Sequence, residues 1–143
     1  MKFAKLIFAL TLTLAVLPSL AAAQLRGSDS IRVKVPFKFV VGNRAVPAGD
    51  YVVRTASTNG MILNISNSDA KVNLMSMVSA ADAGKGSGTY ALMFHQYGDR
   101  FYLWGMRLDN SGTVFKLPES KAEKELQAQN VPAAETTLTA SLQ

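Results

Sequence analysis

The chain has 143 residues, with 15 Lys and Arg against 10 Asp and Glu, one His, one Trp and no Cys. Without cysteine the fold cannot depend on disulfide bonds, so its core alone has to hold it together. The net charge of +5 comes without a run of cations, which argues against a nucleic-acid-binding protein.

Residues 1–23 have the pattern of a secretory signal peptide. Two lysines precede an apolar run, 6–17, which is too short to span a bilayer comfortably. Ala21 and Ala23 satisfy the rule of small residues at a cleavage site, so we expect cleavage between Ala23 and Gln24, with an uncleaved anchor as the alternative. The pattern predicts a periplasmic or secreted product that meets the membrane only transiently, through the signal peptide.

Residues 31–41 carry the clearest strand pattern in the chain. Apolar side chains occupy every second position, and the other phase holds the cations Arg32, Lys34 and Lys38. This period of two predicts one long strand with a buried face and a wet face. The cations and Pro36 favour a place near a sheet edge, and we prefer that interpretation to a surface for an acidic polymer.

Turn-forming residues divide the rest of the chain into further short strands. Gly42-Asn43, Pro47-Ala48-Gly49 and Asn67-Ser68-Asp69 are the first such turns. Residues 81–88 predict a flexible glycine-rich loop whose spacing does not match a phosphate-binding loop. The pattern predicts an all-β fold, a single small antiparallel β-sandwich or partly open barrel of about seven to eight strands with a short C-terminal helix.

Residues 90–108 predict a hairpin around a two-residue turn at Gly98-Asp99. This turn fixes the register of the hairpin, which places His95 opposite Tyr102 and Met93 opposite Trp104. Both faces are apolar or aromatic, so we expect a central hairpin that is covered on both sides.

The sequence after the last predicted strand is rich in helix formers. Ser120 and Glu123 have the spacing of a capping box, and a proline precedes them in the first turn. The polar, Thr-rich end is expected to be disordered. The predicted organisation is a signal peptide at 1–23, a disordered leader at 24–30, a β domain at 31–117, a helix at 118–130 and a disordered tail at 131–143.

Four short motifs are spread along the predicted domain and the start of the helix. They are Pro36-Phe37-Lys38-Phe39, Pro47-Ala48-Gly49-Asp50-Tyr51-Val52-Val53, Tyr97-Gly98-Asp99-Arg100-Phe101 and Leu117-Pro118-Glu119-Ser120. With these motifs the sequence resembles small exported bacterial proteins of no assigned function. The resemblance implies a shared β-rich fold and export, and it implies no catalytic residue.

No pattern in the chain predicts an enzyme. There is no Gly-x-Ser-x-Gly nucleophile motif, and nearly all the carboxylates lie in or beside turns, where Asp is favoured for local hydrogen bonds. A Ser-His-Asp triad is not excluded by counting residues alone. We predict a non-enzymatic domain without a cofactor, in a binding or structural role in the cell envelope.

One face of the predicted hairpin is the candidate partner surface, because an exposed aromatic patch usually marks an interaction site. Its residues are Met93, His95, Tyr102 and Trp104. The expected partner is an envelope protein, a polymer or a small ligand, and not a nucleic acid.

The alternative function is Cu(I) binding by thioether and imidazole groups on a sheet face, in a compartment where free thiols are easily oxidised. The candidate ligands are Met75, Met77, Met93, His95 and Trp104. The simpler interpretation is that the methionines fill gaps in the core and that Trp104 packs on Met93.

Overall fold

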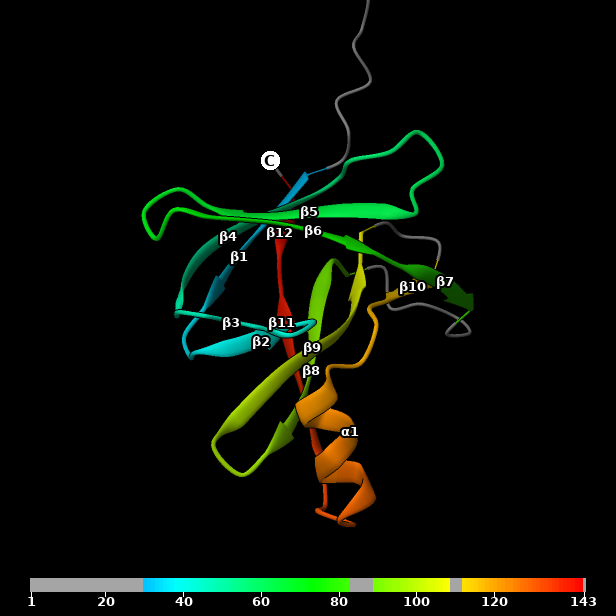
Figure 1. Cartoon of the computed structure of the whole chain (residues 1–143). Coiled ribbons are helices and arrows are strands. Elements are labelled where there is room, and N and C mark those ends of the chain that lie inside the picture. Colours follow the sequence, from blue (N-terminus) through cyan, green and yellow to red (C-terminus); the bar gives the residue numbers. More distant parts are fainter. Residues whose placement is uncertain (1–29, 83–88, 109–111, 143) are drawn as a thin grey trace, which may run out of the picture.

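The computed structural model describes residues 30–82, 89–108 and 112–142, so the predicted signal peptide and most of the predicted leader and glycine-rich loop lie outside the described residues. The described chain folds into two β-sheets with one short helix beside them (Figure 1). The strands are β1 (Ser30–Val35), β2 (Phe39–Val41), β3 (Arg44–Val46), β4 (Gly49–Thr55), β5 (Ile62–Asn67), β6 (Val72–Met77), β7 (Ser79–Asp82), β8 (Ala91–Tyr97), β9 (Arg100–Arg107), β10 (Thr113–Lys116), β11 (Ala134–Thr139) and β12 (Ser141–Leu142). The helix is α1 (Lys121–Ala128).

The two sheets confirm the predicted all-β architecture with a C-terminal helix. One sheet has five strands in the order β12-β1-β4-β5-β6. The other has seven strands, with β11-β8-β9-β10-β7 in order and β2 and β3 attached beside β9. Neighbours pair in antiparallel fashion, except that β2 runs parallel to β9. The described chain contains twelve strands, more than the seven to eight predicted, because the segments predicted as loop and tail also form strands and the predicted strand at 31–41 is divided into two.

The predicted long strand at 31–41 is in fact two strands in different sheets. β1 pairs with β4 in the five-stranded sheet, whereas β2 pairs with β3 and β9 in the other. The chain changes sheets at Pro36, which has no N–H to donate to a ladder. The alternation itself is confirmed, since Ile31, Val33 and Val35 are buried and the three cations are exposed.

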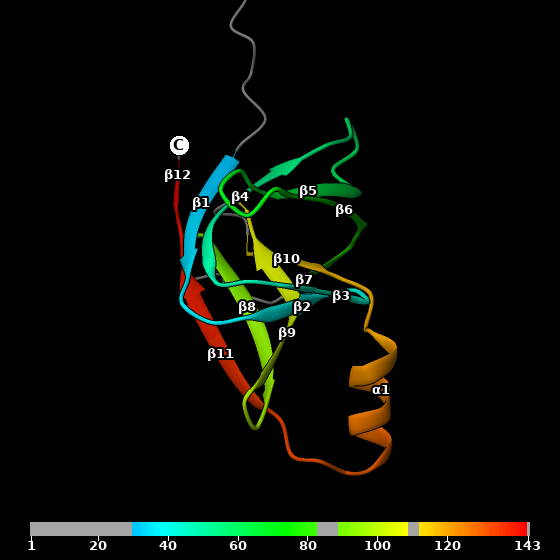
Figure 2. The ribbon, with the colours of Figure 1, turned by 60° about the vertical axis from the view of Figure 1, so that its left-hand side comes forward.

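The end of the chain, predicted as a disordered tail, is also ordered as strands. β11 pairs with β8 from Ala134 to Thr139, and β12 pairs with β1, so this segment joins both sheets (Figure 2). Thr136 and Leu138 turn toward the molecule and their neighbours are exposed, which is the period of a half-buried strand. Leu138 packs against the core. Threonine is β-branched and favours strands, a preference that a reading based on polarity overlooked.

The start of the predicted glycine-rich loop is likewise a strand. Ala81 and Asp82 belong to β7, which pairs with β10 in the seven-stranded sheet. Only Val78 separates β7 from β6, so the chain passes from one sheet to the other within a single extended segment (Figure 1). Val78 is buried where the two sheets meet.

The core lies between the two sheets and is built from the inner face of each. Its buried side chains include Ile31, Tyr51 and Ile65 from the five-stranded sheet and Phe94 and Leu103 from the other. Burying a side chain of this size contributes about 1.5–3 kcal/mol. No helix among the described residues is long and apolar enough to cross a membrane.

Candidate functional site

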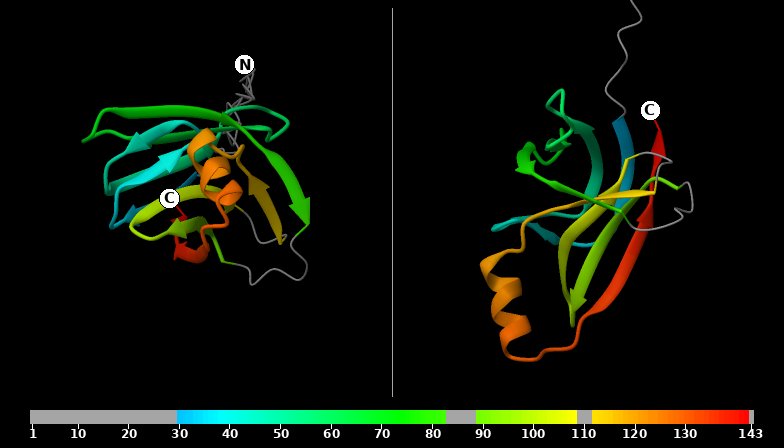
Figure 3. Two further views of the ribbon diagram at one scale, coloured as in Figure 1. Left: turned by 60° about the horizontal axis from the view of Figure 1, so that its bottom comes forward. Right: turned by 90° about the vertical axis from the view of Figure 1, so that its right-hand side faces the viewer.

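Helix α1 stands against the outer face of the hairpin of β8 and β9. In the right-hand view of Figure 3, these two strands lie between α1 and β11. The helix begins at Lys121, later than the predicted start at 118, because Ser120 is the N-cap and its hydroxyl accepts a hydrogen bond of 3.0 Å from the backbone N–H of Glu123. At its other side the helix touches the turn after β2, because the backbone N–H of Lys121 donates to Asn43.

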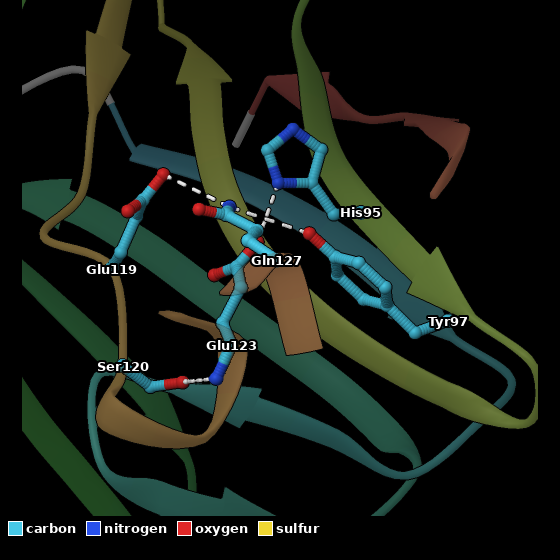
Figure 4. A network of polar contacts seen from close by, with 6 residues as sticks. All are labelled: His95, Tyr97, Glu119, Ser120, Glu123 and Gln127. Carbon is cyan, nitrogen blue, oxygen red and sulfur yellow. Dashed lines mark hydrogen bonds and ion pairs between the residues drawn. The ribbon is translucent and has the colours of Figure 1, made fainter. Parts of the chain in front are cut away.

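The carboxylate of Glu123 is the buried charge of this helix. The residue is only 2% exposed, and its Oε1 lies 2.5 Å from Nδ1 of His95 on β8 (Figure 4). The imidazole N–H donates and the carboxylate accepts, which satisfies a charge that would be costly to bury alone. This contact fixes which ring nitrogen of His95 carries hydrogen, and the other nitrogen points away from Glu123 (Figure 4).

Trp104 stacks on the other side of this histidine. The ring centroids of His95 and Trp104 are 5.0 Å apart and the planes are within 12° of parallel. Trp104 reaches this position because the pairing of β8 with β9 shifts between Met93 and Phe94, which leaves Trp104 as the extra residue of a β-bulge. The bulge lets Leu103 and Met106 both face the core while Trp104 faces outward.

Tyr97 forms the lower part of the same cluster. Its hydroxyl accepts a hydrogen bond of 3.3 Å from Nε2 of Gln127, which also donates to Glu119 (Figure 4). Burial raises the pKa of Tyr97 above its usual value, the hydrogen bond with Gln127 opposes this, and the carboxylates of Glu123 and Glu119 raise the pKa further. The phenol therefore stays neutral in the folded protein across the physiological range.

A pocket of about 280 Å³ opens beside the stacked rings. It is lined by His95, Trp104, Lys116, Leu117, Glu119 and Glu135. The pocket combines an aromatic wall with one cation and two carboxylates. Nε1 of Trp104 is buried and has no hydrogen-bond partner within the described part of the chain. An unpaired N–H of this kind costs about 1–3 kcal/mol and calls for an explanation.

A larger hollow, of about 400 Å³, lies between β2 and the start of β9. Its lining consists of Lys38, Phe39, Val40, Ala45, Asp99, Arg100, Phe101 and Tyr102. The charged side chains there are exposed, as those of the smaller pocket are, but no buried ion pair among the described residues fixes an aromatic wall beside them. The smaller pocket borders the stacked rings of His95 and Trp104, which the contact with Glu123 and the bulge hold in place, and we take it as the candidate site.

Of the four residues of the predicted partner surface, two are buried and two are partly exposed. Met93 and Tyr102 are 9% and 3% exposed, so neither can act as an exposed contact residue. His95 and Trp104 remain partly exposed and line the pocket. Met93 does not lie opposite Trp104 as predicted, because the bulge moves Gly105 into that position. Nearer the turn, the predicted pairing of His95 with Tyr102 is confirmed.

The structure does not assemble the five candidate copper ligands into one site. Met75 and Met77 lie on β6 in the five-stranded sheet, and the other three lie on β8 and β9 of the seven-stranded sheet. Met75 and Met77 are 72% and 71% exposed and project from the same face of their strand. No group of three or more His, Cys, Asp or Glu side chains suited to a metal ion occurs in the described ranges.

The residues of the site that sequence reasoning missed are Lys116, Glu119, Glu135 and the side-chain role of Glu123. The only advance signal was the capping-box position of Glu123, which predicts the bond from its backbone N–H to Ser120 but directs its carboxylate to the backbone N–H of Ser120 rather than to His95. Comparison of the chain with known protein families, with characterised proteins and with solved structures gives no match.

Proposed function

We propose that the protein is an exported, non-enzymatic binding domain that takes its ligand in the pocket beside His95 and Trp104. The N-terminal pattern of residues 1–23 supports export to the periplasm or the medium. The observation that carries the binding role is the stacked pair itself: the buried carboxylate of Glu123 holds His95, and a bulge holds Trp104, at the wall of an open pocket. Such preorganisation lowers the entropic cost of binding.

The lining of the pocket favours an uncharged ligand that carries several hydroxyl groups, such as a segment of a neutral glycan. Lys116 donates, while the carboxylates of Glu119 and Glu135 accept, and hydroxyl groups can do both. Two carboxylates beside one cation disfavour an anionic ligand. The aromatic wall suits the apolar face of a sugar ring.

The surroundings of His95 also support a non-enzymatic role. The contacts of its ring are with Glu123, Trp104 and Tyr97, and no serine or threonine hydroxyl within the described residues bonds to it. A carboxylate and an imidazole without a nucleophile do not make a triad. The pair is better explained as a rigid part of a binding surface.

Trp104 is the single tryptophan of the chain, so its fluorescence reports on the pocket directly. We would titrate the mature protein with neutral oligosaccharides and with anionic ones at equal size. Saturable quenching by a neutral oligosaccharide is expected, and it should be lost in Glu119→Ala/Glu135→Ala and kept in Arg54→Gln, an exposed change on the other sheet. An unchanged spectrum with every neutral oligosaccharide would count against the proposed ligand class, and a response to the anionic series alone would reverse its charge preference.

Copper binding remains a second candidate, favoured by the exposure of two thioethers on one strand face. Only Met75 and Met77 fit this reduced site. An anaerobic titration with Cu(I) against a chelator tests it. If the site exists, Met75→Leu/Met77→Leu loses the ion and His95→Ala keeps it, and equal binding by all three proteins would place the ion elsewhere.

A further inference from the structure

Strand β6 is an open edge of the five-stranded sheet. Within the described residues it pairs with β5 alone. Val72 lies opposite Asn67 at one end of this pairing, and Met77 lies opposite Ile62 at the other. Its second row of backbone N–H and C=O groups therefore faces no strand among the described residues, and one of these groups, the C=O of Met77, accepts a hydrogen bond from the hydroxyl of Ser76. An edge of this kind is a template for strand addition.

The other edge strands of the described chain carry features that discourage such pairing. β3 and β12 have only three and two residues, and β3 contains Arg44 and precedes Pro47. β11 contains Glu135 and follows Pro132, and β7 has four residues and ends at Asp82. β6 has six residues, VNLMSM, with neither a charge nor a proline. It is the one edge of the described sheets without a device against pairing.

The exposed apolar side chains gather at this same strand. Within the described part of the chain the large apolar residues that are exposed are Met61, Met75 and Met77. Met75 and Met77 lie on β6. Met61 lies beside the end of this strand, because its carbonyl accepts a hydrogen bond from the backbone N–H of Val78, the residue that follows Met77. An open edge thus coincides with two exposed apolar side chains, Met75 and Met77, on one face of the same strand, and exposed apolar surface marks interaction sites.

We propose that β6 pairs in antiparallel fashion with β6 of a second copy of this chain, about a two-fold axis at Met75. This register places Met75 opposite its own copy and Met77 opposite Asn73, so the exposed residues of both strands share one face. In this register the inward-facing side chains of the two copies lie on the same side of the joined sheet. A register shifted by one residue would place the inward-facing residues of one copy opposite the outward-facing residues of the other. The strand has no charge, so two copies meet without repulsion, which favours self-pairing over capture of a charged segment.

The expected dimer is weak and reversible. A six-residue edge with two methionines a side buries less than a standard interface of about 1,600 Å². We therefore expect a sedimentation coefficient that rises with protein concentration. Met75→Lys places a cation on the axis, where it faces its own copy, and is expected to give a monomer at every concentration. Ala48→Lys adds the same charge at an exposed turn residue and should leave the dimer intact.

The absence of cysteine allows a sharper test of the register. In the proposed pairing two Met75→Cys chains have Cα atoms about 5 Å apart, within disulfide range. Two Asn73→Cys chains are separated by about 13 Å and cannot join, although Asn73→Cys mixed with Met77→Cys can. Mild oxidation should therefore cross-link Met75→Cys alone, and the mixed pair together, without cross-linking Asn73→Cys by itself.

Both experiments use the full mature chain, and circular dichroism confirms that each variant is folded. A concentration-dependent dimer with the expected disulfide pattern supports the proposal. A wild-type chain that stays monomeric, or a dimer in which Asn73→Cys joins to itself and Met75→Cys does not, overturns it. The result does not depend on the pocket beside Trp104, so the proposed ligand and the proposed dimer can fail separately.

Discussion

Nδ1 of His95 and Oε1 of Glu123 lie 2.5 Å apart, and this contact joins the hairpin to the helix that follows it. It is the point where the fold and the candidate site depend on each other. The helix has a thin apolar face, with Leu126 only half buried, so polar contacts carry much of its attachment. A change in this pair should therefore alter both stability and binding.

Replacing Glu123 by Ala is expected to lower the free energy of unfolding by about 1–3 kcal/mol, because it leaves the imidazole of His95 without its partner. Urea denaturation measures this, and a double-mutant cycle with His95→Ala should give a coupling of about 0.5–3 kcal/mol. Glu125→Ala, on the exposed side of the same helix, is the control and should have little effect. Equal losses for both glutamates would show that the contact adds nothing.

The N-cap offers a separate test of how α1 is held. Ser120→Ala removes the acceptor for the backbone N–H of Glu123 and should cost about 1 kcal/mol, whereas Ser120→Asp restores an acceptor and should recover most of the loss. The comparison uses denaturation midpoints at neutral pH. A loss that Asp does not recover would point to packing of the buried Ser120 rather than to capping.

Tyr97 should make the fold sensitive to alkali. Its folded pKa is raised by burial first and by the nearby carboxylates of Glu123 and Glu119, so the folded state holds this proton more tightly than the unfolded state. The resulting stability is complete below the unfolded pKa of about 10 and is lost as pH rises through the folded value. Unfolding free energies of wild type and Tyr97→Phe, measured from about pH 8 to about pH 11.5, should converge at the alkaline end. The raised pKa of Tyr51 contributes the same pH dependence to both proteins, so it does not change the difference between the two curves. Curves that stay parallel up to the alkaline end would therefore contradict the role of Tyr97.

The C-terminal strand can be tested by hydrogen exchange. Backbone amides of β11 that face β8 should exchange slowly, whereas a disordered tail would exchange at once. Leu138→Ala removes a side chain that packs on the core and is expected to cost about 1–2 kcal/mol. Thr137→Ala, at an exposed position of the same strand, is the matched control and should cost much less.

Export is tested by the mass of the product. A protein expressed in a bacterial host with its own N-terminus should begin at Gln24 when recovered from the periplasm or the medium. Ala23→Arg should block cleavage and leave the longer chain with the membrane fraction. Recovery of the uncleaved wild-type chain in the cytoplasm would contradict both the cleavage site and the compartment.

The elements that the sequence predicts well are those whose evidence is local. The alternation around Val33, the turn at Gly98-Asp99 and the N-cap at Ser120 each depend on a few neighbouring residues. Their backbone preferences are the same in the fold as in a peptide. These local signals were enough to give the fold class.

The features that escaped prediction depend on residues distant in sequence. The bulge at Trp104 allows both Leu103 and Met106 to be buried on the same face. In a regular strand these two residues would point to opposite faces, so the alternation of the sequence does not predict this arrangement. The carboxylate of Glu123 meets a histidine 28 residues away, and nothing near it in the sequence marks that contact. β11 was missed because only Thr136 and Leu138 turn inward, so its composition resembles that of a loop.

The pairing of β1 with β12 has a consequence for folding kinetics. Ile31 pairs with Leu142, so the loop that must close between them spans nearly all of the described domain. Contacts of such separation form late and slow the folding of β proteins. Until they form, β1 and β8 each lack a neighbour, and an intermediate at this stage would expose two further unpaired edges. We expect such an intermediate to aggregate more readily than the native state and to need protection while the last strands dock.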